Sequence, residues 1–173
     1  MTRRGFTIVE LIITITIMGI LLTLAVVNVN STQMKARDNE RKADIEAITG
    51  HLETFYKVGI DSSTSYYRYP TTTNLINGSS TTGITTYLRD ADLKSFTAPT
   101  SADAVTSFIA ATNNTQTAAG VTPQPAVGQY VYQPILASGA LCTGSVGTDC
   151  RKYNLYYKLE SDNVVYMVTS KNQ

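Results

Sequence analysis

The chain of 173 residues contains no tryptophan, one histidine and two cysteines. The single histidine, His51, argues against a zinc site, which needs three or four ligands together, and against a hydrolase with an activated nucleophile. No glycine-rich phosphate loop joins a strand to a helix. Basic and acidic residues nearly balance at a net charge of +1, which gives no case for bulk nucleic-acid binding. We therefore expect neither an enzyme nor a bound metal or cofactor.

Charge is absent over one long stretch near the amino terminus. Phe6 to Val27 is a run of 22 residues whose only charge is Glu10, and fourteen of its residues are Phe, Ile, Leu or Val. As a helix this run spans about 33 Å, enough to cross the hydrocarbon core of a bilayer. A secretory signal peptide is the alternative, but its apolar core is shorter and ends at a small-residue cleavage site, which residues 23–31 lack. We expect a transmembrane helix.

Glu10 has two interpretations. An intramembrane carboxylate is either tolerated without a role or pairs with a cation. If the chain is cut after Gly5, the new amine of Phe6 is such a cation, on a neighbouring subunit or within the same chain.

The start of the chain resembles the processing site of type IV pilins and pseudopilins. Gly5 is followed by Phe6 and Thr7, and Glu10 is the fifth residue after the junction. The resemblance implies that a prepilin peptidase removes residues 1–5 and methylates the amine of Phe6. Glu10 would then meet the Phe6 amine of an adjacent subunit, and Gly19 matches a glycine that lets the helix loosen in the filament.

The same resemblance implies where the protein resides and what it contacts. The precursor is expected to be a single-pass protein of the inner membrane, held in lipid until it joins an extracellular surface filament. Expected partners are further copies in a helical homopolymer, the prepilin peptidase, the inner-membrane assembly platform and minor pilins. Adhesion and twitching motility are associated activities. DNA is a weaker candidate partner, through Arg151 and Lys152, which are otherwise two solvated charges.

A second helical stretch, Gln33 to Lys57, continues the first. Its apolar residues recur at steps of three and four, which predicts one buried stripe. The stripe consists of Ile45, Ile48, Leu52, Phe55 and Tyr56. Charges of alternating sign cover the other faces of this stretch, either as a solvated surface or as contacts between subunits. Together the two stretches predict one helix from Phe6 to Lys57.

The rest of the chain predicts a small sheet. Residues 58–128 are turn-rich, with short strands and short helices expected at 87–93 and 102–111. A strand at 129–132 is expected to end at Pro134 or to lie at an edge of the sheet. Alternation in 153–159 and 164–168, around a turn, predicts a β-hairpin packed on the helix stripe.

The two cysteines, Cys142 and Cys150, flank a loop of seven residues. A disulfide is expected if this part is exported; half a metal site or two free thiols are the alternatives. A carboxy-terminal bridge of this kind also fits the pilin resemblance.

These features predict an α+β fold of the type IV pilin kind: a long amino-terminal helix packed against a small antiparallel β-sheet. The expected segments are a cleaved leader (1–5), a transmembrane or filament-core helix (6–30), an amphipathic half-helix (31–57), a variable loop region (58–128) and carboxy-terminal strands with the cysteine loop (129–173). The expected function is a structural subunit of a type IV pilus. The alternatives are a pseudopilin of a type II secretion or DNA-uptake machine and, more distantly, a bitopic anchor presenting a ligand-binding domain.

Overall fold

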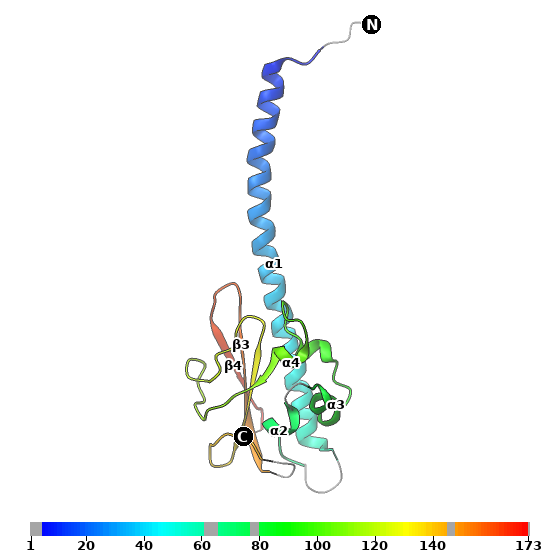
Figure 1. The fold of residues 1–173 in the computed structure, drawn as a ribbon, viewed down its shortest axis with the longest axis vertical. Coiled ribbons are helices and arrows are strands. Elements are labelled where there is room, and N and C mark those ends of the chain that lie inside the picture. Colours follow the sequence, from blue (N-terminus) through cyan, green and yellow to red (C-terminus); the bar gives the residue numbers. More distant parts are fainter. Residues whose placement is uncertain (1–4, 61–65, 77–79, 145–147, 173) are drawn as a thin grey trace.

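One helix dominates the molecule. The computed structural model describes residues 5–60, 66–76, 80–144 and 148–172, apart from the side chains of residues 25–28. Helix α1, Ile8–Val58, is 51 residues long, which corresponds to about 76 Å. Its amino-terminal half projects from a globular part built around its carboxy-terminal half (Figure 1). The single long helix is confirmed, although it begins two residues later than predicted.

A glycine ends α1. Gly59 adopts a φ of 64°, in the left-handed region that favours glycine, and its N–H donates to the carbonyl of Phe55 at 2.7 Å. The chain then turns back towards the sheet.

In the part of the chain that the structure describes, four strands form one sheet in the order β1-β2-β3-β4. They are β1 Phe108–Ala110, β2 Tyr130–Leu136, β3 Cys150–Lys158 and β4 Val165–Thr169. β2, β3 and β4 pair antiparallel, with β3 and β4 forming the predicted hairpin. β1 runs parallel to β2, so the sheet is mixed and the expectation of a purely antiparallel sheet was wrong. Residues 111–129 provide the long connection that a parallel pair requires.

Pro134 does not end β2, and β2 is an inner strand between β1 and β3, not an edge strand as the second alternative expected. It pairs in register with Tyr153 of β3, and β2 continues to Leu136. The last pair between β1 and β2 is Ala110 with Tyr132, so no neighbouring strand needs an N–H from Pro134 on that side.

Short helices fill the region before β1. They are α2 Thr72–Leu75, α3 Thr82–Tyr87, the 3-10 helix η1 Leu93–Phe96 and α4 Ala104–Ser107. The helix expected at 87–93 is absent from the described chain, because α3 ends at Tyr87 and Asp90 takes a φ of 60°. The helix expected at 102–111 is confirmed only in α4. Beyond α4 the chain continues as β1, where the ring centroids of Phe108 and Tyr132 lie 5.9 Å apart. Tertiary packing therefore overrides helix propensity in this segment.

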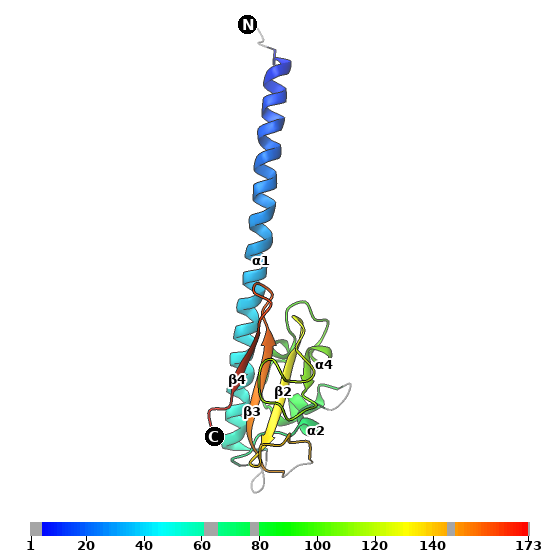
Figure 2. The ribbon, with the colours of Figure 1, turned by 90° about the vertical axis from the view of Figure 1, so that its left-hand side faces the viewer.

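The core lies between α1 and the inner face of the sheet (Figure 2). Of the predicted stripe, four residues are buried and Tyr56 is half-buried. Tyrosines supply much of the opposing surface, including Tyr130, Tyr132 and Tyr153. A second, smaller cluster around Val131 and Tyr156 covers the outer face.

A buried carboxylate, Glu53, ties α1 to the end of the chain. It accepts hydrogen bonds from the hydroxyls of Tyr69 and Tyr153, from the N–H of Lys171 and from the side-chain amide of Asn172, at 2.6 to 3.1 Å. Burial raises the pKa of both tyrosines well above their usual value, so they remain donors across the physiological range. Glu53 is 7% exposed and has its acceptor sites filled.

Replacing Glu53 by glutamine is expected to lower the free energy of unfolding by about 2 to 3 kcal/mol, because the amide group leaves buried donors without an acceptor. Urea denaturation of the detergent-solubilised full chain measures this. Glu46→Gln, at an exposed position of α1, is the matched control and should change stability little. Equal, small effects of both changes would contradict the role given to Glu53.

Candidate assembly site

Thr7 determines where α1 begins. Its backbone is extended, and its hydroxyl accepts a hydrogen bond from the N–H of Glu10 at 3.2 Å, as an N-cap does. Gly5 and Phe6 therefore precede the helix, and Phe6 is 80% exposed. The bond between them lies in exposed, non-helical backbone, which suits a peptidase. Arg3 and Arg4 of the expected leader lie outside the described residues.

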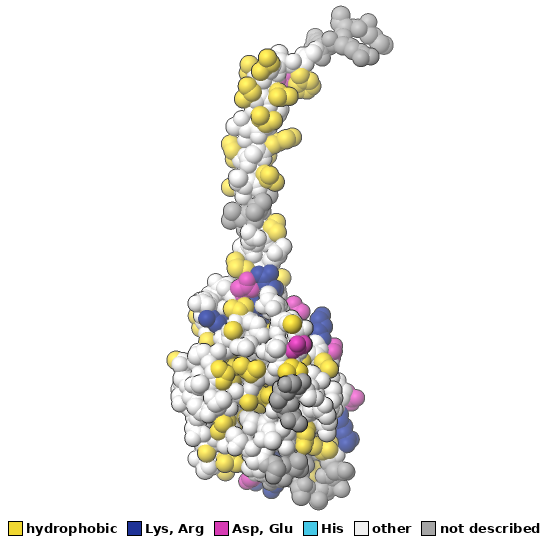
Figure 3. Space-filling model, viewed as in Figure 1, with side chains coloured by type: hydrophobic (Ala, Val, Ile, Leu, Met, Phe, Trp, Pro, Cys, Tyr) yellow, Lys and Arg dark blue, Asp and Glu magenta, His cyan; other side chains and the backbone are white. Residues whose placement is uncertain are grey.

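The half of α1 that follows is an exposed apolar surface. Its large side chains from Ile8 to Leu24 are between 52% and 79% exposed. An 18-residue window of α1 is apolar and long enough to cross a membrane, and none of it is buried within the chain. Figure 3 shows apolar side chains along this projecting part, whereas charged side chains gather mainly on the globular part. Such a surface requires lipid or other chains to cover it.

Polar groups within this surface are largely satisfied. Three threonine hydroxyls donate to helix carbonyls at 2.7 to 2.8 Å. The pairs are Thr14 with Leu11, Thr16 with Ile12, and Thr23 with Ile20. This bonding makes the hydroxyls acceptable in hydrocarbon and leaves Glu10 as the one charged side chain described there. Glu10 lies in the first turn, where the helix dipole favours a negative charge.

Gly19 lies within the apolar half, and α1 continues through it without a break. A Cβ built at Gly19 meets nothing within 4 Å, so packing inside the single chain does not require glycine. Its predicted part in loosening the helix stays a prediction.

Charges on the other half of α1 hold the globular part. Arg41 is fully buried, and it donates to the Asp38 carboxylate and to the carbonyl of Val127, both at 2.8 Å. The Asp38 carboxylate also accepts from the N–H groups of Glu160 and Ser161 at 2.8 and 2.9 Å. These residues join α1 to the β3–β4 turn within one chain. A solvated surface therefore does not describe Asp38 and Arg41, whereas Glu40, Lys42 and Glu46 are exposed as that interpretation expects. Charge contacts between subunits stay a prediction.

The burial of Asp38 and Arg41 could have been predicted from their spacing in the sequence. Asp38 and Arg41 extend the spacing of three and four residues of the buried stripe that continues through Ile45 and Ile48. Glu53, by contrast, gave no such signal, because its partners come from positions 69, 153, 171 and 172.

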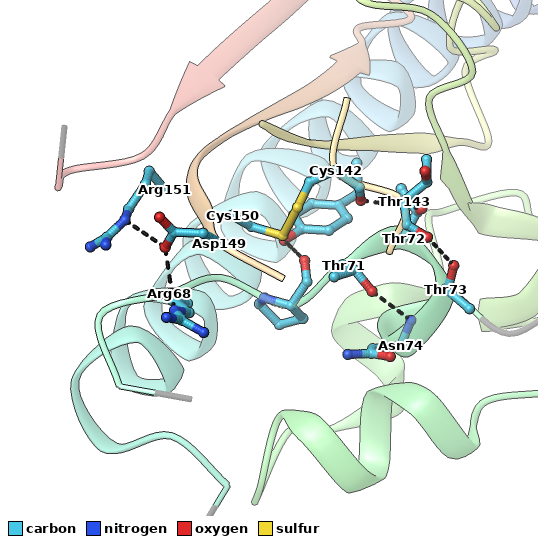
Figure 4. The surroundings of a disulfide bond; sticks show 12 residues. Arg68, Thr71, Thr72, Thr73, Asn74, Cys142, Thr143, Asp149, Cys150 and Arg151 are labelled. Atoms are coloured by element: carbon cyan, nitrogen blue, oxygen red, sulfur yellow. Dashed lines mark hydrogen bonds and ion pairs between the residues drawn. A yellow bond between two sulfur atoms is a disulfide. The ribbon is translucent and has the colours of Figure 1, made fainter. Parts of the chain in front are cut away.

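The predicted disulfide between Cys142 and Cys150 is present (Figure 4). Both cysteines are buried, and their carbonyls accept from the N–H groups of Thr72 and Tyr69 respectively, at 3.2 and 2.8 Å. The cysteine loop therefore fastens the segment leading into α2 against the sheet.

Arg151, one of the two candidate contacts for DNA, lies beside this disulfide. It is 2.6 Å from the carboxylate of Asp149, which also lies 3.3 Å from Arg68 (Figure 4). Asp149 thus offsets much of the local positive charge. His51 lies at the edge of a small cavity beside Tyr87 and Arg89.

Two kinds of comparison find known proteins that are similar to this chain. Residues 1–26 match the family model described as the prokaryotic N-terminal methylation motif. Type II secretion system core protein G of Dickeya chrysanthemi is 39% identical over 70 residues, which is 40% of this chain and 41% of that protein. The proteins of that name from Klebsiella pneumoniae and Klebsiella michiganensis are 39% and 41% identical over 70 and 71 residues, which is 40% and 41% of this chain and 45% of each relative. The chain thus spans less than half the length of these curated relatives. No solved structure matches it significantly.

A long helix that begins at this motif, is apolar and long enough over one half to cross a membrane, and carries a small sheet on its other half is a pilin-like α+β fold. The chain is thus similar to pilin-like proteins at its opening residues, as those residues predict, and to type II secretion proteins over 70 or 71 residues.

A pH dependence follows from the ion pair between Arg37 and Glu160. Arg37 donates to Glu160 at 2.8 Å and so holds the pKa of Glu160 below its ordinary value of 4.5. The stabilisation is present above pH 4.5 and is lost as the pH falls through the folded-state pKa. Glu160→Gln should therefore cost up to about 1 kcal/mol at pH 7 and much less near pH 3. Denaturation at both pH values, with the exposed Glu40→Gln as control, measures this; a cost that does not change with pH would contradict it.

Proposed function

We propose that this protein is a structural subunit of the pseudopilin kind, which polymerises through α1 into a filament of a secretion-type machine. The observation that carries the proposal is the apolar half of α1, which begins at a methylation motif and is not buried by any of the residues that the structure describes. The relatives are type II secretion proteins, so they favour this alternative over the pilus subunit that the sequence first suggested. The more distant alternative, a bitopic anchor, requires neither cleavage after Gly5 nor polymerisation, so an experiment can distinguish it from the proposed subunit.

Processing creates the group that Glu10 needs. Cleavage between Gly5 and Phe6 produces an amine at a residue that lies before the helix, with the Glu10 carboxylate in the first turn. An ion pair in a water-poor environment is far stronger than the same pair in water. A Phe6 amine of a neighbouring subunit would therefore neutralise Glu10 and fix the axial position of one helix against the next.

The partners follow from this sequence of events. Prepilin peptidase processes the precursor in the inner membrane, where lipid covers the apolar half of α1. An assembly platform then brings subunits together, and helices of other subunits replace the lipid. The globular part remains outside the bilayer, where its disulfide is stable. The subunit needs no catalytic group of its own for any of these steps.

The amino-terminal residue of the natural protein tests the proposal. Intact mass and terminal sequencing of protein from membranes and from sheared cell-surface material should identify a chain that starts at methylated Phe6. Processed protein retained with the cell envelope supports the pseudopilin, whereas abundant processed protein in the sheared fraction supports a pilus. A chain still carrying Gly5 in wild-type membranes would favour the anchor.

Glu10→Ala is expected to leave the protein inserted and processed but to reduce filaments at least tenfold, because the amine of a neighbour loses its partner. Membrane fractionation and electron microscopy of overproduced filaments measure the two effects. Glu40→Ala, an exposed carboxylate on the globular half of α1, is the matched control. Normal filaments from Glu10→Ala would contradict the proposed pair between Glu10 and the Phe6 amine of a neighbouring subunit.

A further inference from the structure

A pocket opens at the carboxy-terminal end of α1. It lies between the last turns of this helix, its Gly59 cap and residues 87–90, and its volume is about 170 Å³. A cavity of this size accepts a benzene ring. Phe55 and Tyr87 supply aromatic walls, with ring centroids 6.2 Å apart. This distal pocket therefore has room for one aromatic side chain.

Polar groups lie at the mouth of the distal pocket. His51 is half-buried there, whereas Arg89 and Asp90 are exposed. The Arg89 guanidinium is held in place, because it donates to the carbonyl of Ile60 at 2.9 Å. A guanidinium beside the pocket attracts the face of an aromatic ring, and the neighbouring polar groups can hydrogen-bond a hydroxyl. Among aromatic side chains, these features fit tyrosine, which has an apolar ring and a polar tip.

An exposed tyrosine lies at the same height on the other side of α1. Tyr67 is 62% exposed, and its N–H donates to the carbonyl of Tyr56 at 2.8 Å. Tyr56 is two residues from Thr54 and from Val58, which both line the distal pocket, so it lies about 160° around the helix from each. In the view of Figure 1, α3 lies to the right of this end of α1 and the sheet lies to its left. Tyr67 and the distal pocket therefore belong to opposite faces of the same helix turns.

The backbone of Tyr67 is held in an unfavourable conformation. Its φ of 61° lies in the left-handed region, which bulky residues rarely adopt. Besides the bond to Tyr56, its carbonyl accepts from Arg151 at 3.4 Å, and its ring meets the Tyr56 ring edge-on with centroids 5.8 Å apart. Such strain persists only where the surrounding structure enforces it, and it is frequent at functional positions. Here the enforced conformation keeps the ring of Tyr67 at the surface.

We propose that Tyr67 of one copy of this chain enters the distal pocket of a neighbouring copy. The ring packs between Phe55 and Tyr87 of that neighbour, beside the Arg89 guanidinium. The contact joins the globular parts of two subunits side by side. It rests on the proposed function and specifies a lateral surface of the polymer.

Anchoring in one bilayer makes this contact available. Two copies held by their apolar halves have parallel α1 helices at equal heights, and Tyr67 and the distal pocket lie at the same height in each copy. The contact therefore needs little displacement along the helix axis. Because the two surfaces are different parts of one chain, each added copy leaves one tyrosine and one pocket unused, as an open polymer requires.

Photo-cross-linking tests where the ring of residue 67 lies in the assembly. Full-length chains with p-azidophenylalanine in place of Tyr67 are irradiated in the cell envelope, and the covalent dimer is isolated on a denaturing gel. Mass spectrometry should find the link between residue 67 and the peptides that contain residues 51–59 or 87–90. The same group in place of Tyr166, another exposed tyrosine, is the matched control and should give no dimer linked at those peptides.

The outcomes separate this contact from the proposed function. Filaments of processed protein in which residue 67 links elsewhere, or only within its own chain, would overturn the contact and leave the proposed function intact. A chain that is neither processed nor assembled would reject both.

Tyr67→Asn removes the ring but suits the backbone, because asparagine tolerates the left-handed region. Filament yield should fall about tenfold or more, as expected when a buried aromatic anchor is lost. Tyr67→Phe keeps the ring and should assemble nearly normally, as should the control Tyr66→Asn at the exposed neighbouring position. The thermal midpoint of each detergent-solubilised variant should stay close to that of the wild type, which separates lost assembly from lost folding. Normal filaments from Tyr67→Asn, or an equal loss from Tyr66→Asn, would contradict the proposal.

Discussion

The structure depends on a helix whose apolar surface its own domain cannot bury. The sheet and its loops cover α1 only from about Asp38 onwards, while the large side chains before Leu24 remain exposed. Each such side chain is worth about 1.5 to 3 kcal/mol when removed from water. In the described structure this free energy is not recovered, because these side chains stay exposed. A lipid bilayer or a bundle of similar helices recovers it, and the absence of charge around Glu10 keeps both environments accessible.

The globular part is fastened to α1 by polar anchors as well as by the apolar core. Asp38 and Arg41 hold the β3–β4 turn at one end of the contact, and Glu53 holds the chain's last residues at the other. Removing one partner from such a buried network is costly because the remaining charge stays unsatisfied. Two anchors about 22 Å apart along the helix resist rotation of the sheet about α1. The proposed role as a subunit of a regular polymer would require such a fixed orientation.

Local signals allowed much of this fold to be predicted from the sequence. The uncharged run, the motif around Gly5 and the alternation in β3 each lie within a few residues. The parallel placement of β1 was not predictable in this way, because its partner Tyr130 is 22 residues away and the segment itself reads as helix. The burial of Arg41 was not predicted either, since a charged residue on a helix ordinarily faces solvent. Its buried position is set by Pro99, Val127 and Glu160, which only the folded chain brings near.

In the proposed assembly, the hydrophobic effect does not drive the exchange of lipid for neighbouring helices. Lipid tails are as apolar as leucine, so moving Leu22 or Ile15 from bilayer to filament changes little on that account. In the proposed filament, what remains is close packing and the neutralisation of Glu10 by an amine at residue 6. These two contributions differ in kind, since one depends on shape and the other on charge. Because both would come from neighbouring chains, the same subunit could be stable in lipid and still prefer one register in the proposed filament.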